Sequence, residues 1–137
     1  MFAIEKPLPR PTEDSAPFWA AAVQGELRMQ QCARCRHIRF PPALLCARCL
    51  SAEAAWIKLS GRGAVYSWIV IHPSQHPAFN AEVPYNVAII ELEEGPRLHT
   101  NIIGCPNDRI YIGMPVEVVF EKVSDDTALV KFRPRQR

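Results

Sequence analysis

Four cysteines in two closely spaced pairs place the strongest constraint on the fold of this chain. Two residues separate Cys32 from Cys35 and Cys46 from Cys49, and ten residues lie between the pairs. A spacing of two residues lets one tight turn direct both thiolates at the same ion, and two such turns complete a tetrahedron. The pattern therefore predicts a metal site, with Zn²⁺ favoured and iron as the alternative.

Four thiolates fill the coordination sphere of Zn²⁺ and leave no position for water, which is typical of a structural site. We expect the ion to hold residues 26–55 together, because so short a segment cannot build a core of its own. Disulfides are disfavoured because the chain starts without the basic and apolar regions of an export signal, and this start favours the cytoplasm. The fifth cysteine, Cys105, is interpreted as a small packed residue rather than a nucleophile.

The first 25 residues predict an extended arm followed by one short helix. Pro7, Pro9 and Pro11 alternate along the arm, and proline disfavours helix in the residue before it. The arm is interpreted as a frayed terminus, with contact to a partner or to its own domain as the alternative. Ser15 as a cap and Gly25 as a stop bound an alanine-rich helix. Its apolar stripe, which must pack against the rest of the protein, comprises Phe18, Trp19, Ala22 and Val23.

Short β segments dominate the chain after residue 26. Gly61 and Gly63 lie between the β-rich runs 56–60 and 64–72, which suggests one long strand bent by a bulge. Five β-rich runs follow the cysteines, each bounded by Gly, Pro, Asn or Asp: 64–72, 85–92, 98–103, 116–120 and 128–132. Five strands at this spacing with no helix pattern between them indicate a small antiparallel barrel of the OB type, with a small sandwich as the alternative.

The fold class that follows is mainly β, with an N-terminal helix, a zinc ribbon and a C-terminal five-stranded OB-fold barrel. We expect the arm and helix over residues 1–25, the ribbon over 26–55 and the barrel over 56–137. No apolar run approaches the roughly 20 residues of a membrane span, so we expect no membrane partner.

Charge is unevenly distributed, although the net charge is only +2. Residues 27–52 contain five arginines and no acidic residue, and part of this charge offsets a four-thiolate zinc site. Residues 63–130 contain three basic and nine acidic residues. An OB barrel that binds single-stranded nucleic acid needs a basic groove with stacking aromatic side chains. The acidic barrel therefore disfavours nucleic acid. The basic ribbon and the basic C-terminal tail suit the phosphates of a nucleotide-bearing cofactor, with solvated surface arginines as the alternative for most of them.

From residue 9 to residue 134 the chain resembles the zinc-ribbon OB-fold proteins associated with acyl-CoA enzymes, long catalogued as a domain of unknown function. The stretches that carry the resemblance are Pro17–Trp19, Gly25–Leu27, Gln31–Cys35, Phe40–Pro42, Cys46–Cys49, Ser60–Gly63, Val65–Ser67, Pro84–Tyr85, Glu91–Pro96, Thr100–Gly104 and Ile112–Phe120. The chain departs from the family at two positions: Arg36 stands where glycine is usual and Ala47 where proline is frequent. Neither change removes a metal ligand.

The resemblance implies a rubredoxin-like zinc ribbon ahead of the OB barrel and a non-catalytic role. Family members accompany acetyl-CoA thiolases, hydroxymethylglutaryl-CoA synthases, or thiolase-like aldolases and hydratases of steroid side-chain degradation. We therefore expect a hetero-oligomer with a thiolase-like enzyme, in which this subunit helps to hold or channel an acyl-CoA.

Within that role we assign two candidate sites. The phosphates of CoA are assigned to basic ribbon residues and the pantetheine or acyl chain to nearby apolar residues: Arg34, Arg36, Arg39 and Arg48, with Phe18, Trp19, Phe40 and Leu44. The partner interface is assigned to the loop that contains Phe79, Pro84 and Tyr85, because aromatic anchors often dominate such contacts. The alternative for the arginines is to balance the zinc–thiolate charge, and the alternative for the loop is local packing.

Two other function classes are weaker. A nucleic-acid-binding module is the main alternative, but it rests on analogy between folds. An enzyme is the weakest interpretation because His37, His72, His76 and His99 are dispersed. His72 and His76 have helical i, i+4 spacing, but Pro73 between them favours a loop and disfavours a second metal site.

Overall fold

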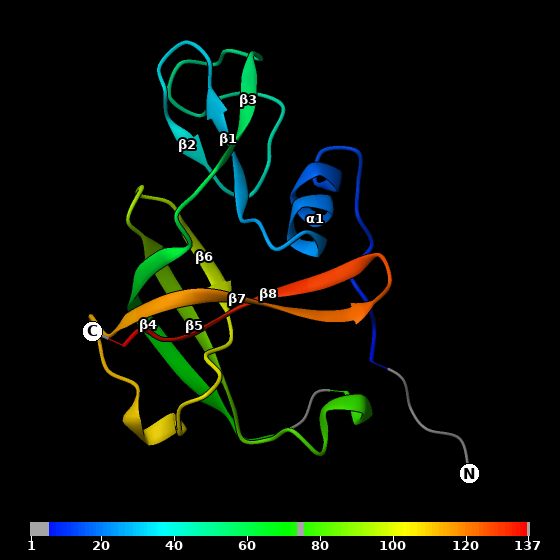
Figure 1. Ribbon diagram of the computed structural model, residues 1–137, viewed down its shortest axis with the longest axis vertical. Helices are drawn as coiled ribbons and strands as arrows, with labels where there is room; N and C mark the ends of the chain where they lie inside the picture. The colour runs from blue at the N-terminus through cyan, green and yellow to red at the C-terminus, as the bar shows by residue number, and fades with distance from the viewer. Residues whose placement is uncertain (1–5, 74–75, 137) are drawn as a thin grey trace.

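The computed structural model describes residues 6–73 and 76–136, which form one α-helix and two antiparallel β-sheets (Figure 1). The smaller sheet has the order β2-β1-β3 and the larger has the order β6-β5-β4-β7-β8. The elements are α1 (Ala16–Val23), β1 (Arg28–Cys32), β2 (Ile38–Arg39), β3 (Ala54–Lys58), β4 (Arg62–Ile71), the 3₁₀ turn η1 (Pro77–Phe79), β5 (Tyr85–Leu92), β6 (Arg97–Thr100), the 3₁₀ turn η2 (Asn107–Arg109), β7 (Pro115–Ser124) and β8 (Thr127–Pro134).

The larger sheet curls until its two edges meet, which confirms the five-stranded OB-type fold. Just after edge strand β6, the N–H of Ile103 donates to the carbonyl of Phe132 on β8 at 2.8 Å. The N–H of Phe132 donates to the carbonyl of Asn101 at 3.1 Å. Alternate residues along the strands face inward, so fully buried Val116, Ile90 and Phe132 form the centre of the core.

The expectation of one long strand through Gly61 and Gly63 is wrong. Strand β3 pairs with β1 in the ribbon, whereas β4 pairs with β5 and β7 in the barrel, so the chain changes sheets at this point. Gly61 has a φ of +79°, and a Cβ there would clash with Cγ1 of Val118. The bulge lies further along β4, between Val65 and Ser67. The expected boundary between residues 55 and 56 falls inside β3.

Helix α1 packs beside β1 and against the β7–β8 hairpin (Figure 1). It ends before Gly25, whose φ of +79° is the left-handed conformation that glycine adopts readily. Its buried face consists of Phe18, Ala21 and Ala22. The expected stripe was therefore partly wrong. Phe18 and Ala22 are buried as expected, but Trp19 and Val23 are only half-buried, and Ala21 is buried although the stripe did not include it.

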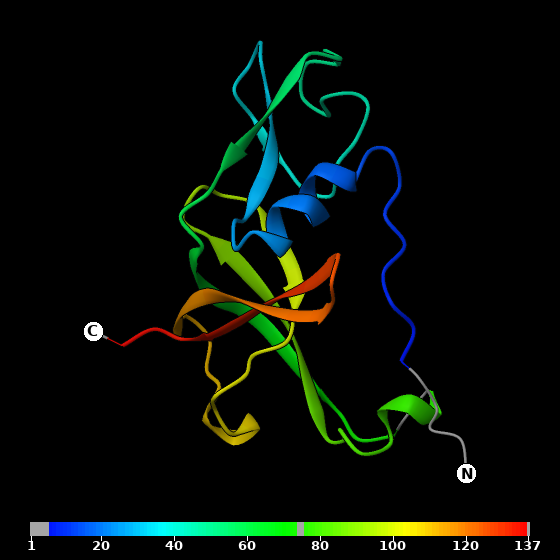
Figure 2. The same cartoon turned by 45° about the vertical axis from the view of Figure 1, so that its right-hand side comes forward.

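The described part of the N-terminal arm runs along the side of the molecule toward η1 (Figure 2). Its Lys6 Nζ lies 2.6 Å from Oε1 of Glu82 and 5.6 Å from the ring centroid of Phe79. The arm thus contacts its own domain, which was the alternative interpretation of its sequence. In the described ranges, no helix combines the length and the apolar composition needed to cross a bilayer.

Candidate metal centre and ligand-binding surfaces

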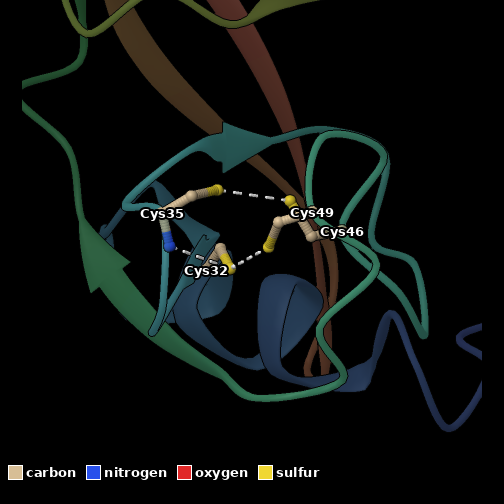
Figure 3. A group of neighbouring side chains, drawn as sticks. All are labelled: Cys32, Cys35, Cys46 and Cys49. Carbon is tan, nitrogen blue, oxygen red and sulfur yellow. Dashed lines mark hydrogen bonds between the residues drawn. The ribbon is translucent and has the colours of Figure 1, made fainter.

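The four cysteines converge on one point in the ribbon (Figure 3). All their sulfur atoms lie within 4.8 Å of one another, and the Cys32–Cys49 and Cys35–Cys46 sulfur pairs are each 3.5 Å apart. A tetrahedral site with Zn–S distances of about 2.3 Å separates its sulfurs by about 3.8 Å. The geometry therefore fits a four-thiolate zinc site, as the spacing of the cysteines predicts.

Two similar turns bring the cysteines together. The N–H of Arg36 donates to the carbonyl of Cys32 at 3.0 Å, and the N–H of Leu50 donates to that of Cys46 at 2.8 Å. Each turn ends in the left-handed region, with φ values of 67° at Arg36 and 63° at Leu50. A residue with a side chain is strained in this conformation by roughly 1–2 kcal/mol, so Arg36 and Leu50 each reduce the stability of their turn by about that amount.

The turns also set the proton affinities of the thiols. The backbone N–H of Cys35 is the main cause that lowers the pKa of Cys32, to about 6. The backbone N–H of Cys49 is the main cause that lowers the pKa of Cys46. The N–H of His37 acts to lower the pKa of Cys35, but burial and the neighbouring thiols outweigh it and raise that pKa to about 11. Zn²⁺ binds thiolates, so its binding must displace the remaining protons.

Half of the residues assigned to an acyl-CoA ligand are exposed to solvent. Arg34, Arg36 and Arg48 are exposed on the metal-binding turns, and their guanidinium groups have no hydrogen-bond or ion-pair partner among the described residues. Leu44, in the loop between the cysteine pairs, is 72% exposed. These four residues place three exposed positive charges on the metal-binding turns and one exposed apolar side chain on the loop between them.

Two of the assigned residues have structural roles. Arg39 is 7% exposed, and it donates from Nε to Oε1 of Gln30 at 2.8 Å and from Nη2 to the carbonyl of Ala43 at 2.9 Å. Phe18 is 6% exposed, and its ring centroid lies 5.2 Å from those of Trp19 and Phe40. Both side chains are largely enclosed by their own neighbours, although Arg39 and Phe40 also line a small surface pocket. Trp19 and Phe40 are half-buried beside Phe18.

The residues assigned to the partner interface lie together at the far end of the barrel from the ribbon. The rings of Phe79 and Tyr85 are 6.3 Å apart, and Pro84 is exposed beside them. Phe79 and Tyr85 line a cleft of about 570 Å³ whose other wall is the N-terminal arm. Sequence reasoning missed this cleft, because the only sign of it was the run of alternating prolines in the arm.

The remaining candidates have ordinary roles. Cys105 is half-buried and packs against the barrel core, as a small packed residue would. His76 accepts at Nδ1 from the N–H of Ala78 at 3.0 Å and caps η1. Within residues 6–73 and 76–136, the side chains grouped closely enough to hold a metal ion are the four cysteines.

Two family models match the chain in the order that the structure shows. Residues 19–53 match the ChsH2 rubredoxin-like zinc ribbon domain, and residues 56–121 match the ChsH2 C-terminal OB-fold domain. A chain of the solved Ltp2-ChsH2(DUF35) aldolase superposes with a TM-score of 0.83 and is 42% identical, over 92% of this chain and 98% of that chain.

Curated relatives fall into two groups. A probable enoyl-CoA hydratase alpha subunit from Thermomonospora curvata is 43% identical over 94% of this chain and 40% of the relative. A 3-oxo-4,17-pregnadiene-20-carboxyl-CoA hydratase alpha subunit from Mycobacterium tuberculosis is 35% identical over 82% of this chain and 35% of the relative. The chain thus spans only about two fifths of these subunits.

The second group consists of shorter proteins that the chain matches over most of their length. A DUF35 domain-containing scaffold protein from Methanocaldococcus jannaschii is 40% identical over 76% of this chain and 78% of the relative. Identity at this level over both lengths, together with the two family models and the four-cysteine ribbon, shows that the chain belongs to the DUF35 family, with the ChsH2 type of zinc ribbon and OB fold.

Proposed function

We propose that this protein is a non-catalytic accessory subunit that binds a thiolase-superfamily enzyme and helps that enzyme to bind an acyl-CoA. The observation that carries the proposal is the 42% identity to a chain of the Ltp2-ChsH2(DUF35) aldolase over almost the whole of both chains. The names of the relatives support it, since they include two hydratase subunits for CoA esters and a scaffold protein.

The metal centre supports a structural role for the ribbon in this subunit. Four thiolate ligands leave no open position on Zn²⁺, so the ion would fix the turns without taking part in chemistry. Those turns carry Arg34, Arg36 and Arg48 on their exposed side. A guanidinium group donates two hydrogen bonds at once to a phosphate, which suits the phosphates of CoA.

The barrel end that contains Phe79, Pro84 and Tyr85 is the proposed contact with the enzyme. Aromatic anchors dominate the energy of many protein interfaces, and these two rings lie side by side near an exposed proline. The ribbon and this end lie at opposite ends of the molecule (Figure 1). An enzyme that covers one side of the subunit would therefore meet the ligand arginines and the aromatic anchors at separate points.

Affinity purification from the native cell tests the subunit role. We expect a thiolase-like enzyme in stoichiometric amount, and we expect the double variant Phe79→Ala, Tyr85→Ala to recover less of it. Ile69→Ala is the matched control, because Ile69 is 57% exposed on β4. If the protein elutes alone, and if it changes neither the solubility nor the turnover of the candidate enzyme, the proposal is wrong.

Calorimetry tests the ligand role separately. Acyl-CoA is titrated into the enzyme alone, into this subunit alone and into their complex. We expect the double variant Arg34→Ala, Arg48→Ala to weaken binding to the complex at least about thirtyfold, since each of the two lost charged hydrogen bonds to phosphate is worth roughly 1 kcal/mol or more. Arg109→Ala removes an exposed arginine from the barrel and should leave the affinity unchanged. Equal affinities of the enzyme alone and of its complexes with wild type and the double variant, with no binding to the subunit alone, would assign the whole acyl-CoA site to the enzyme.

A further inference from the structure

A cleft between the N-terminal arm and the barrel is large enough for a small molecule. Its volume is about 570 Å³, within the roughly 300–1,000 Å³ that is typical of ligand pockets. The barrel contributes Phe79, Tyr85, Ile103 and Leu129, and the arm contributes Leu8. Leu8 and Ile103 are 48% and 38% exposed, so both present apolar surface that the fold itself does not cover.

The charged side chains of the wall neutralise one another. Lys6 Nζ lies 2.6 Å from Oε1 of Glu82, and Lys131 Nζ lies 2.9 Å from Oε2 of Glu121. The wall therefore holds two cations and two anions, each with a partner. Among the described residues, the wall thus carries no net charge and presents no unpaired side-chain charge to an ionic ligand.

The amide side chains of the wall are also occupied. Asn86 donates to the carbonyl of Ile102 at 2.8 Å and accepts from the N–H of Ile102 at 2.7 Å. Asn101 donates to the carbonyl of Asn86. The hydroxyl of Tyr85 differs, because it has no hydrogen-bond partner among the described residues. The wall thus offers apolar surface and one free hydroxyl group.

The arm forms one wall of this cleft. At its far end, the N–H of Ala16 donates to the carbonyl of Thr12 at 2.8 Å and joins the arm to α1. Near the cleft, the Lys6–Glu82 pair has side chains that are 47% and 39% exposed, and exposed ion pairs stabilise a contact only weakly. The arm is thus held by an exposed ion pair at its cleft end and by its connection to the packed helix α1 at the other end.

We propose that this cleft binds a neutral, mainly apolar small molecule that carries one hydrogen-bonding group, such as a long-chain alcohol. The paired charges leave no net charge to attract an ionic ligand, the apolar wall accommodates a hydrocarbon body, and the Tyr85 hydroxyl binds the single polar group. The proposal needs no partner enzyme, so its failure would leave the proposed accessory role untouched, and failure of that role would leave this one untouched.

The test uses the complete protein alone, with 1-decanol as the probe and decanoate as its charged counterpart. Methyl NMR spectra are recorded during each titration. We expect saturable shifts at the methyl groups of Leu8, Ile103 and Leu129, and an affinity for decanoate at least about tenfold lower. Tyr85→Phe should weaken decanol binding several-fold. Tighter binding of decanoate, shifts confined to the ribbon, or no saturation up to the solubility limit of decanol would each overturn the proposal.

Variants of the two walls complete the test. Ile103→Glu places a charge in the cleft, and Leu8→Ser removes apolar surface from the arm without changing either sheet. Both should weaken decanol binding at least about fivefold. Ile112→Glu is the matched control because Ile112 is 62% exposed and does not line the cleft. Equal affinity in wild type, Ile103→Glu and Leu8→Ser would show that decanol binds elsewhere and would overturn the proposal.

Discussion

The ribbon and the barrel stabilise small β-sheets by different means. The ribbon encloses four thiols, two of them fully buried. Its apolar side chains pack against the barrel core and do not form a core of their own: Met29, Ile38, Trp56 and Ile57. The barrel encloses a continuous apolar core that includes Val65, Ile90, Val116 and Phe132. Structural zinc supplies about 10–16 kcal/mol in small modules, whereas one buried apolar side chain supplies about 1.5–3 kcal/mol. A metal ion thus replaces the several core residues that the ribbon is too short to contain.

Removal of one thiolate should produce the largest difference between the two regions. We expect Cys46→Ser to lose zinc and to expose the amides of the ribbon, because the binding energy of the ion is also the folding energy of that segment. The barrel strands should remain protected. Elemental analysis and amide hydrogen exchange measure both effects. Cys105→Ser is the control and should retain zinc; a Cys46→Ser protein with a full equivalent of zinc and unchanged protection would contradict the metal site.

Truncation in the barrel core should produce the opposite pattern. Phe132 is fully buried where β8 meets the end of β6, and we expect Phe132→Ala to cost about 3–5 kcal/mol in the free energy of unfolding. Zinc content should not change. Urea denaturation followed by tryptophan fluorescence gives the stability, with Ile69→Ala as an exposed control within about 0.5 kcal/mol of wild type. A cost below about 1 kcal/mol would mean that the barrel does not depend on this contact.

A smaller effect should appear at the metal-binding turns. Arg36 has a φ of 67°, which glycine adopts without strain, so we expect Arg36→Gly to raise zinc affinity by up to about fivefold, or about 1 kcal/mol. Competition with a chelator measures the affinity. Arg34→Gly is the matched control on the same turn: Arg34 is not among the residues with positive φ, so added backbone freedom should lower the affinity slightly. The same sign for both variants would show that strain at Arg36 is not the cause.

The charge difference between the regions leads to a prediction of no effect. Residues 63–130 contain three basic and nine acidic residues, so the barrel should repel a phosphate backbone at ordinary salt. We expect no change in the anisotropy of a labelled single-stranded DNA or RNA up to micromolar protein. Micromolar, salt-sensitive binding that disappears on substitution of the barrel face would contradict this prediction and favour the nucleic-acid-binding alternative.

The metal centre was predictable in detail because its determinants are local in sequence. The spacing of the cysteines dictates the two turns, and the left-handed conformation at Arg36 agrees with the glycine that is usual there in the family. The route through Gly61 was not predictable in this way. A bulge and a change of sheets both need glycine, and only the pairing of β3 with β1 distinguishes them.

Burial within the candidate ligand site was also beyond sequence reasoning. Arg39 looked like its exposed neighbours on the ribbon, but Gln30 and Ala43 enclose its guanidinium group. The cleft under the arm depends on a contact between Lys6 and Glu82, which are 76 residues apart. Neither residue type nor spacing indicates such a contact, because it forms only after the barrel has placed both walls.

The packing of α1 on β8 has a consequence for how a ribosome delivers this protein. The ribosome synthesises Phe18 about 110 residues before it reaches β8. At roughly 5–20 residues per second, the apolar face of α1 therefore stays without its β8 contact for about 5–20 s. The ribbon needs only its own short segment and a metal ion, so it can finish first. The uncovered helix face is therefore the surface that a chaperone would meet on the nascent chain.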